Sequence, residues 1–168
     1  MWRKAEVSLR PEISEDIPFL EELVFTIREG EPGFRDLALT ERTTLLKEQA
    51  CLQRAHYRKV YPAAHFMIVE ADGRPIGRYY VYQASDHLLI VELSITPAFQ
   101  GHGIGSQLMK SSLAEAMRTK MPVRLSVEIG NPAISFYEGL GFVWERTEAS
   151  HHGMGWMPPS ECFGLRKL

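Results

Sequence analysis

The alternation of apolar and polar positions predicts strands in several parts of the chain. Residues 5–11 and 142–150 alternate with a period of two, as half-buried strands do. Residues 65–96 hold three apolar or aromatic runs separated by the turn signals Asp72-Gly73 and Ser85-Asp86, which predicts a meander of three strands. Further strands are expected at 122–129 and 161–168, with residues 151–159 as a loop before the last strand.

Apolar residues three and four positions apart predict four helices. The first follows Ser14 and ends at Gly30, and the second begins near Thr40. The third begins at Ile104, and a short fourth helix opens at Asn131-Pro132, where Asn suits the N-cap and Pro the first helical position. The element order β-α-α-β-β-β-α-β-α-β-β predicts a mixed α/β fold around one sheet. We expect residues 1–168 to form a single domain.

Composition narrows the function classes. A hydrophobic fraction of 45% and a charged fraction of 24% are typical of a globular protein, and the formal charge of −2 argues against nucleic acid as a partner. Two cysteines, Cys51 and Cys162, are too few for a disulfide framework or a zinc site. No stretch approaches the ~20 apolar residues that span a bilayer, and the N-terminus lacks the apolar run of a signal peptide. We therefore expect a cytoplasmic protein that binds no membrane.

Three glycines, Gly101, Gly103 and Gly105, stand within five positions at the start of the third predicted helix. Glycine inside a helix costs about 1 kcal/mol relative to alanine, so these positions need a reason. Bare backbone and the free N–H groups of a helix N-terminus favour a bound anion such as phosphate, and a glycine-rich turn without a ligand is the alternative. The absence of a following Lys excludes a P-loop. Ser106 stands where a Rossmann-type dinucleotide turn needs its third glycine.

Two motifs together resemble the GNAT superfamily of N-acetyltransferases. The segment QGHGIG, residues 100–105, fits the pattern Arg/Gln-x-x-Gly-x-Gly/Ala, and NPAISFYEGLGF follows at 131–142. The resemblance runs from about Pro62 to Phe142. It implies a central mixed, mostly antiparallel sheet of about seven strands with a splayed parallel pair, flanked by about four helices.

The resemblance also implies an activity, the transfer of an acetyl group from acetyl-CoA to a primary amine. The pyrophosphate of coenzyme A would lie on the backbone of the glycine turn, and its pantetheine arm would pair with the strand before it. The implied cofactor-binding residues are Leu93, Ser94, Ile95, Gln100, Gly101, His102, Gly103, Ile104, Gly105, Ser106, Asn131, Ala133 and Tyr137.

Two residues are candidates for the chemistry. Tyr137 matches the family tyrosine that donates a proton to the leaving thiolate, and a packed aromatic residue is the alternative. Glu92, a carboxylate in an otherwise apolar strand, is a candidate general base. The alternative is that it lies at a solvent-facing mouth of the strand or pairs with a nearby Arg. Asn131 stands six residues before Tyr137, whereas the family spacing is seven, so it either contacts pantetheine or only caps the helix.

The acceptor side is less defined. By resemblance, Phe34, Arg35, His151, His152 and Trp156 could line a pocket for a small-molecule or peptide amine. No third ligand accompanies the adjacent histidines, so we expect no metal site. A homodimer is compatible with the sequence. Two other functions remain open, a regulatory or catalytically degenerate acyl-CoA-binding domain and, third, a Rossmann-type nucleotide binder.

Overall fold

The computed structural model describes residues 6–159 of the chain. These residues form seven strands and four α-helices, together with two short 3-10 turns. This inventory confirms the predicted mixed α/β class. The chain divides into two compact units, residues 6–83 with 90–107 and residues 84–89 with 108–159. That all of it is one domain stays a prediction.

Four strands form the sheet of the first unit in the order β1-β2-β3-β4. Their bounds are Val7–Pro11, His65–Ala71, Arg74–Gln83 and Leu88–Ile95. The pairs β1–β2 and β2–β3 are antiparallel. Asp72 and Gly73, with φ of 49° and 76°, make the tight turn between β2 and β3, as the Asp-Gly signal predicts.

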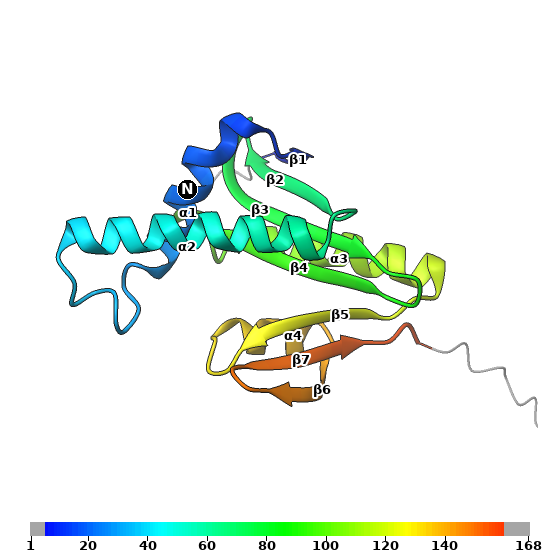
Figure 1. Ribbon diagram of the computed structural model, residues 1–168. Helices are drawn as coiled ribbons and strands as arrows, with labels where there is room; N and C mark the ends of the chain where they lie inside the picture. The colour runs from blue at the N-terminus through cyan, green and yellow to red at the C-terminus, as the bar shows by residue number, and fades with distance from the viewer. Residues whose placement is uncertain (1–5, 160–168) are drawn as a thin grey trace, which may run out of the picture. The chain divides into compact units, whose positions relative to one another are not determined.

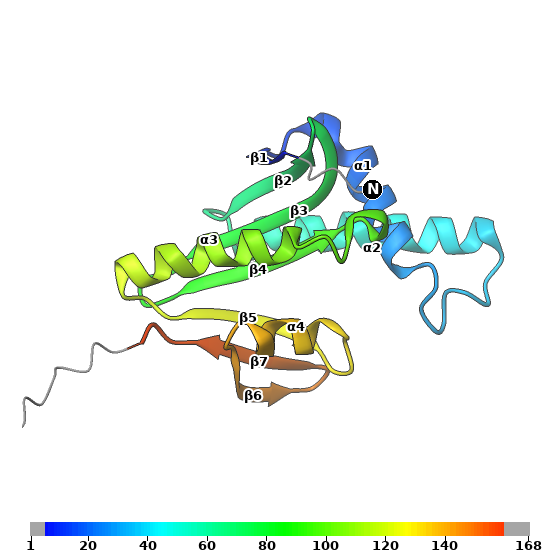
Figure 2. The same cartoon turned by 180° about the vertical axis from the view of Figure 1, so that it is seen from behind.

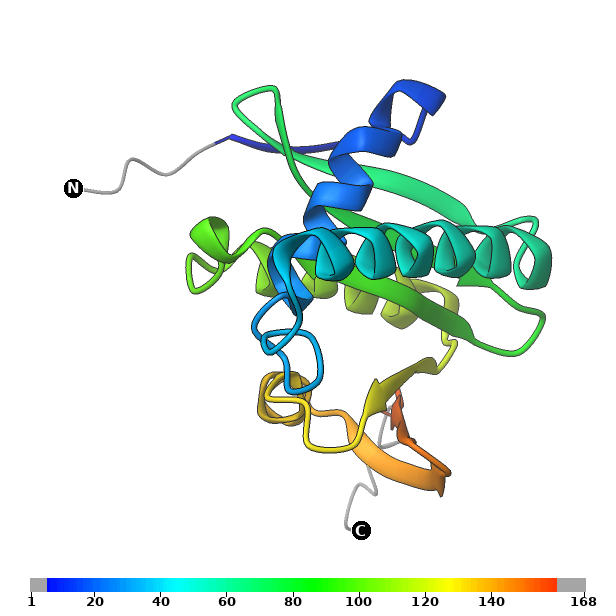
Figure 3. The same ribbon diagram turned by 60° about the vertical axis from the view of Figure 1, so that its left-hand side comes forward.

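Helices α1 (Ile17–Arg28) and α2 (Leu39–Val60) cover one face of this four-stranded sheet, as Figures 1 and 3 show. The buried face of α1 is apolar and consists of Leu20, Leu23 and Val24. In α2 only Leu46 and Ala50 are buried. The rest of α2 therefore meets the sheet mainly through polar side chains.

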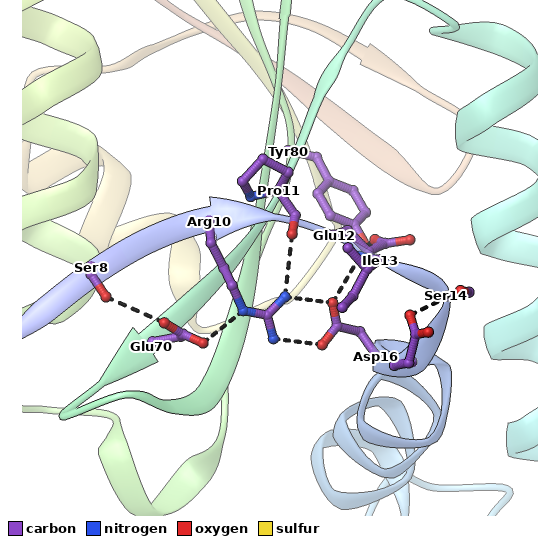
Figure 4. Close-up of polar contacts among 10 residues, drawn as sticks. Ser8, Arg10, Pro11, Glu12, Ile13, Ser14, Asp16, Glu70 and Tyr80 are labelled. Atoms are coloured by element: carbon purple, nitrogen blue, oxygen red, sulfur yellow. Dashed lines mark hydrogen bonds and ion pairs between the residues drawn. The ribbon is translucent and has the colours of Figure 1, made fainter.

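A partly buried ion pair connects β1 to the 3-10 turn Ser14–Asp16 that leads into α1 (Figure 4). Arg10 donates to both carboxylate oxygens of Asp16, at 2.7 and 2.6 Å, and to Glu70 on β2 at 2.7 Å. The Ile13 N–H also donates to Asp16, at 2.9 Å. These hydrogen bonds, above all those from Arg10, lower the pKa of Asp16 although burial opposes its charge.

The C-terminal end of β4 lies very close to β3. A Cβ added at Gly77 would overlap the Ser94 carbonyl oxygen and would lie 3.1 Å from Ile95 Cα. Only glycine allows this approach. Just beyond it, Thr96 donates to the Ile76 carbonyl twice, from its N–H at 2.8 Å and from its hydroxyl at 2.6 Å. These contacts hold the residue at which the chain leaves β4.

The second unit contains β5 (Val123–Glu128), α4 (Ala133–Gly139), β6 (Val143–Glu148) and β7 (His151–Trp156). β7 lies between β5 and β6 and is antiparallel to both. Helix α4 lies against this three-stranded part, which Figure 2 shows from behind. The buried residues of this unit include Val123, Leu125, Phe142 and Met154.

The expectation of a loop over residues 151–159 is wrong for its first six residues, which form β7. Gly153 and Gly155 suggest a loop in the sequence, yet each serves close packing in a strand. A Cβ at Gly153 would lie 2.9 Å from Arg146 Cγ on β6, and one at Gly155 would overlap the Glu145 carboxylate. The strand expected at 161–168 lies outside the described residues.

Candidate functional site

A glycine turn links β4 to helix α3 (Ile104–Thr119). The turn and the first four residues of the helix belong to the first unit, and the rest of the helix belongs to the second. Gly101 and Gly103 have φ of +75° and +79°, a region that residues with a Cβ rarely adopt. The Gln100 side chain folds back and donates to the Ile95 carbonyl at 2.8 Å. Gln100 to Gly103 are exposed, so the turn presents its backbone at the surface.

The start of α3 offers backbone donors beside this turn. The N–H of Gln107 donates to the Gly103 carbonyl at 3.0 Å, so Gly103 stands at the N-cap. The N–H groups of Ile104, Gly105 and Ser106 precede the first bond of the helix ladder and have no carbonyl partner within it. Such N–H groups, with the partial positive charge of the helix, stabilise an anion. The turn therefore fits the pyrophosphate of a nucleotide-type cofactor.

Glu92 of β4 is held by residues from two other elements of the first unit. Its Oε2 accepts from the Tyr57 hydroxyl of α2 at 2.7 Å and lies 3.5 Å from Nη2 of Arg78 on β3. Its Oε1 accepts from the hydroxyl of Ser94. The side chain of Glu92 is 16% exposed. The pairing with an Arg, one of the possibilities left open by the sequence, is thus observed. A role as a base stays a prediction.

Arg78 is buried, with a side chain that is 4% exposed. Its Nη2 also donates to Gln53 of α2 at 2.6 Å, whereas its Nε has no hydrogen-bond partner among the described residues. Burial opposes the charge of Arg78, but the Glu92 carboxylate beside it raises its pKa. Burial, and next the charge of Glu92, raise the pKa of Tyr57, so that its hydroxyl remains a donor at neutral pH.

A second buried carboxylate, Glu12, lies near this group. It accepts from Arg54 Nε at 2.8 Å, from Arg58 Nη2 at 2.7 Å and from the hydroxyl of Tyr80. Burial would raise its pKa, but the hydrogen bonds from Tyr80, Arg58 and Arg54 outweigh burial and lower it. Tyr80 in turn packs edge-on against the Tyr57 ring, with centroids 6.1 Å apart. Glu12 therefore fixes α2 to the sheet beside Glu92.

Sequence reasoning missed Tyr57, Arg78 and Glu12. A signal for Tyr57 exists in the helical period of α2, since Leu46, Ala50, Gln53 and Tyr57 recur at spacings of four, three and four. Gln53 and Tyr57 continue the face of α2 that holds the buried Leu46 and Ala50. Polar residues at such positions indicate that the sheet presents polar side chains to this part of the helix.

Tyr137 belongs to α4 in the second unit and is 9% exposed. Its ring packs against Phe136 and Phe142, with centroids 5.1 and 5.9 Å apart. The sequence left open that Tyr137 is a packed aromatic residue, and this packing is observed. The proton-donor role of Tyr137 stays a prediction.

Asn131 caps the start of α4. Its side-chain oxygen accepts from the Ala133 N–H at 2.8 Å, and its carbonyl accepts from the Ile134 N–H at 3.1 Å. Gly130, with φ of +82°, turns the chain just before it. These two hydrogen bonds show that Asn131 caps the helix. Contact of Asn131 or Ala133 with pantetheine stays a prediction.

The expected acceptor residues lie in both units. In the first, Phe34 lies under the Arg28 guanidinium at 5.2 Å from its ring centroid, and Arg35 is exposed beside Asp36. A cavity of about 510 Å³ opens at the start of α2, and neither residue lines it. Its lining residues are Leu37, Thr40, Glu41, Thr44, Leu45 and Glu48.

The other three expected acceptor residues lie on β7 in the second unit. The His152 ring lies edge-on to Trp144, with centroids 4.1 Å apart, and its Nδ1 is 2.9 Å from the Thr147 hydroxyl. His151 Nδ1 lies 2.9 Å from the Ser150 hydroxyl, and a Cβ added at Gly141 would lie 3.4 Å from the Trp156 ring. Within residues 6–159, no three His, Cys, Asp or Glu side chains gather as they would around a metal ion. No helix in that range is both long and apolar enough to cross a membrane.

Comparison with known proteins agrees with this geometry. Residues 62–144 match the family described as "Acetyltransferase (GNAT) domain", a range that includes the glycine turn, Glu92 and Tyr137. A Bacillus subtilis protein with the provisional name ribosomal protein bS18-alanine N-acetyltransferase is 30% identical over 83 residues. The alignment covers 48% of this chain and 54% of that protein, so the chain spans about half the length of its curated relative.

Solved structures share the fold over nearly the whole chain. The PaiA N-acetyltransferase of Thermoplasma acidophilum, crystallised with coenzyme A, has a TM-score of 0.68 and 19% identity, over 90% of this chain and 99% of that one. An acetyltransferase of Thermus thermophilus has a TM-score of 0.64 and 18% identity, over 90% and 96%. The fold is the one that these two acetyltransferase structures have. Residues 62–144 of the chain match the GNAT acetyltransferase domain.

Proposed function

We propose that this protein is an N-acetyltransferase that transfers the acetyl group of acetyl-CoA to a primary amine. The observation that carries the proposal is the exposed turn of Gln100–Gly103, with Gly101 and Gly103 in the left-handed region, directly before α3. A residue with a Cβ would be strained at either glycine. The match of residues 62–144 to the GNAT acetyltransferase domain supports the same activity.

The residues present fit coenzyme A. The N–H groups of Ile104, Gly105 and Ser106 would hold the pyrophosphate, and His102 lies within the same exposed turn. Leu93, Ser94 and Ile95 would pair with the pantetheine arm, because they form the end of β4 that leads into the turn. When bound, acetyl-CoA supplies an acetyl group activated as a thioester.

The chemistry requires a proton donor and an oriented amine. The nitrogen lone pair attacks the thioester carbonyl carbon, the new C–N bond forms and the C–S bond breaks. The Tyr137 hydroxyl gives its proton to the leaving sulfur, and the proton lost by the amine passes to water or to Glu92. General acid catalysis of this kind contributes about 10²–10⁴-fold to the rate.

The acceptor is a small-molecule or peptide amine. The name of the B. subtilis relative, an alanine N-acetyltransferase of a ribosomal protein, favours the α-amine of a protein N-terminus. Phe34, Arg35, His151, His152 and Trp156 remain candidates for contacts with it.

A second candidate function is a regulatory acyl-CoA-binding domain without efficient catalysis. The observation that favours it is the engagement of Glu92 by Tyr57, Arg78 and Ser94, because these contacts occupy the carboxylate oxygens that would receive the proton of the amine.

Two measurements test the proposal. Acetyl-CoA should raise the melting temperature, because it binds the folded state only, whereas NAD should not. Thiol release from acetyl-CoA should then be detected with at least one amine from a panel of polyamines, amino acids, aminoglycosides and peptides, including one with N-terminal alanine. Stabilisation without release on any amine would favour the regulatory domain. Stabilisation by NAD alone would overturn both.

A further inference from the structure

We propose that two copies of this chain associate through the outer face of α2, packed antiparallel, so that Lys59 of each copy enters the cavity at the start of α2 in the other copy. All the residues concerned belong to the first unit. The inference goes beyond the proposed acetyl transfer and does not depend on it, since the mass of the protein in solution is measured without any acceptor amine.

The outer face of α2 is a line of exposed residues on the side of the helix turned away from the sheet. Its members recur at spacings of four and three, and they lie about half a turn from the buried Leu46 and Ala50. Figure 1 shows α2 in front of the sheet, with this side toward the viewer. The outer face consists of Glu41, Leu45, Glu48, Leu52, Ala55 and Lys59.

Two leucines of this face lie in contact with water. Leu45 is 42% exposed and Leu52 is 70% exposed, although both are large apolar residues. They stand seven positions apart, which is the spacing at which apolar residues meet a second helix in paired helices. The two leucines therefore offer the apolar part of a contact with another helix.

The cavity at the start of α2 gives the same face a negatively charged hollow. Glu41 and Glu48 line it together with the apolar Leu37 and Leu45, and its volume is about 510 Å³. Within residues 6–159, the side chains of Glu41 and Glu48 make no hydrogen bond or ion pair. The group that fits is an apolar stem that ends in a cation, as in a lysine side chain.

The matching cation lies at the other end of the outer face. Lys59 is exposed and has no ion-pair partner in the described part of the chain. It follows Glu41 by 18 positions, which is about five full turns, so both side chains lie on one line about 27 Å long. Within one copy the two charges are too far apart to pair, whereas Lys59 of a second copy can reach Glu41.

A two-fold axis at the level of Ala50, midway between Glu41 and Lys59, makes the outer face complementary to itself. Antiparallel packing about this axis brings Lys59 of each copy to Glu41 of the other. The same axis places Leu52 of one copy between Leu45 and Leu52 of the other, so the apolar parts also meet. Parallel packing in register would instead set Glu41 against Glu41 and Lys59 against Lys59, which like-charge repulsion disfavours.

The size of the contact sets its strength. A face about 27 Å long on a helix about 10 Å wide buries less than the ~800 Å² per partner of a standard stable interface. The protein should therefore exchange between monomer and dimer, with a dissociation constant on the order of 10 µM.

The test follows the mass of the full chain by sedimentation velocity between about 1 and about 500 µM, a range that spans this dissociation constant. The wild type should change from monomer to dimer as the concentration rises. Lys59→Glu and Glu41→Lys should each raise the dissociation constant about tenfold or more, because each sets like charges together. The double variant Glu41→Lys/Lys59→Glu should restore dimerisation, since opposite charges face each other again.

An equimolar mixture of the two single variants tests the antiparallel arrangement itself. In a mixed dimer, an outer face with two negative ends meets one with two positive ends, so both contacts join opposite charges. The mixture should dimerise at concentrations at which neither variant dimerises alone.

Lys47→Glu is the matched control, because it makes the same change of charge on the same helix. Lys47 lies about a third of a turn away from the outer face, and its amine is 3.8 Å from the Glu21 carboxylate. This variant should leave the dissociation constant unchanged. Every substituted side chain is exposed, so all variants should melt near the temperature of the wild type when measured as monomers.

A cross-link gives a second, independent measurement. The exposed Cys51 lies near the two-fold axis, and helices packed about 8–10 Å apart would place the two Cys51 sulfur atoms about 10 Å from each other. Cys162 is the only other cysteine of the sequence. A bismaleimide of matching length should therefore join the Cys162→Ser protein into a covalent dimer, and the further change Lys59→Glu should prevent this.

Three results would overturn the inference. One is a wild type that stays monomeric over the whole concentration range. Another is dimerisation that Lys59→Glu and Glu41→Lys leave unchanged, since the contact would then lie on a different face. The third is a mixture of the two variants that stays monomeric, because antiparallel pairing of Glu41 with Lys59 requires the mixed dimer.

Discussion

Arg10 binds Asp16 through two parallel hydrogen bonds, Nη1 to Oδ2 at 2.7 Å and Nη2 to Oδ1 at 2.6 Å. The Asp16 side chain is 6% exposed, whereas that of Arg10 is 31% exposed. The pair thus lies at the edge of the interior, where a two-point guanidinium–carboxylate contact is stronger than a surface ion pair. It ties β1 to the start of α1.

This pair predicts a loss of stability in acid. The pKa of Asp16 is lowered in the folded protein, so its contribution is present above the ordinary aspartate pKa and is lost as the pH falls through the folded value. Asp16→Asn should reduce the free energy of unfolding at pH 7 by about 1–3 kcal/mol. The difference from the wild type should shrink below about pH 4, as the aspartate of the wild type takes up its proton. Urea unfolding across this pH range measures it.

Asp36→Asn is the matched control, because Asp36 is exposed and its nearest Arg, Arg35, is 3.7 Å away and also exposed. It should leave the stability almost unchanged at every pH. A loss in Asp16→Asn that is equal at pH 7 and pH 3 would show that the charge of Asp16 is not the cause.

A substitution in the glycine turn can separate the cost of backbone strain from the loss of cofactor binding. Gly103→Ala places a Cβ at φ of +79°, which costs about 1–2 kcal/mol, although no heavy atom within 4 Å would collide with it. The protein should therefore fold with a lowered melting temperature. Because the methyl group occupies the open face of the turn, the stabilisation by acetyl-CoA should be largely lost.

Gly73→Ala is the control for this variant. Gly73 has φ of +76° in the hairpin between β2 and β3, and its Cβ position is equally open. It should lower the melting temperature by a similar amount and keep the full response to acetyl-CoA. Equal responses of the two variants to acetyl-CoA would argue against an anion site at Gln100–Ser106.

Tyr137→Phe tests the proposed proton donor. The ring contacts with Phe136 and Phe142 are kept, so the melting temperature should change little. Turnover with the best amine should fall by about 10²-fold or more, while the acetyl-CoA affinity stays near that of the wild type. Tyr82→Phe, on β3, removes a hydroxyl from a tyrosine of the first unit and should leave turnover unchanged. Wild-type turnover in Tyr137→Phe would remove Tyr137 as the acid.

Much of the architecture was predictable because its signals are local. The Asp72-Gly73 turn, the apolar face of α1 and the Asn131 cap each depend on residues within a few positions of one another. The glycine turn was predictable for the same reason, since the positive φ of Gly101 and Gly103 is a local property of the backbone.

The contacts around Glu92 and Glu12 were not predictable. Tyr57 is 35 positions from Glu92, and Tyr80 is 68 positions from Glu12, so no spacing in the sequence joins them. The strand β7 was missed for a different reason. Gly153 and Gly155 lower strand propensity, and only the neighbouring side chains of Arg146 and Glu145 explain why glycine is required there.

The close approach of Gly77 to Ser94 and the two hydrogen bonds from Thr96 to Ile76 affect the entropy change when a ligand binds at the end of β4. A loop that must freeze around its ligand loses conformational entropy when it binds. Here the strand end that carries the glycine turn is already fixed by its neighbour before any ligand arrives. The conformational entropy of this strand end would therefore be lost during folding and not when acetyl-CoA binds. More of the favourable contact energy would then contribute to the affinity for acetyl-CoA.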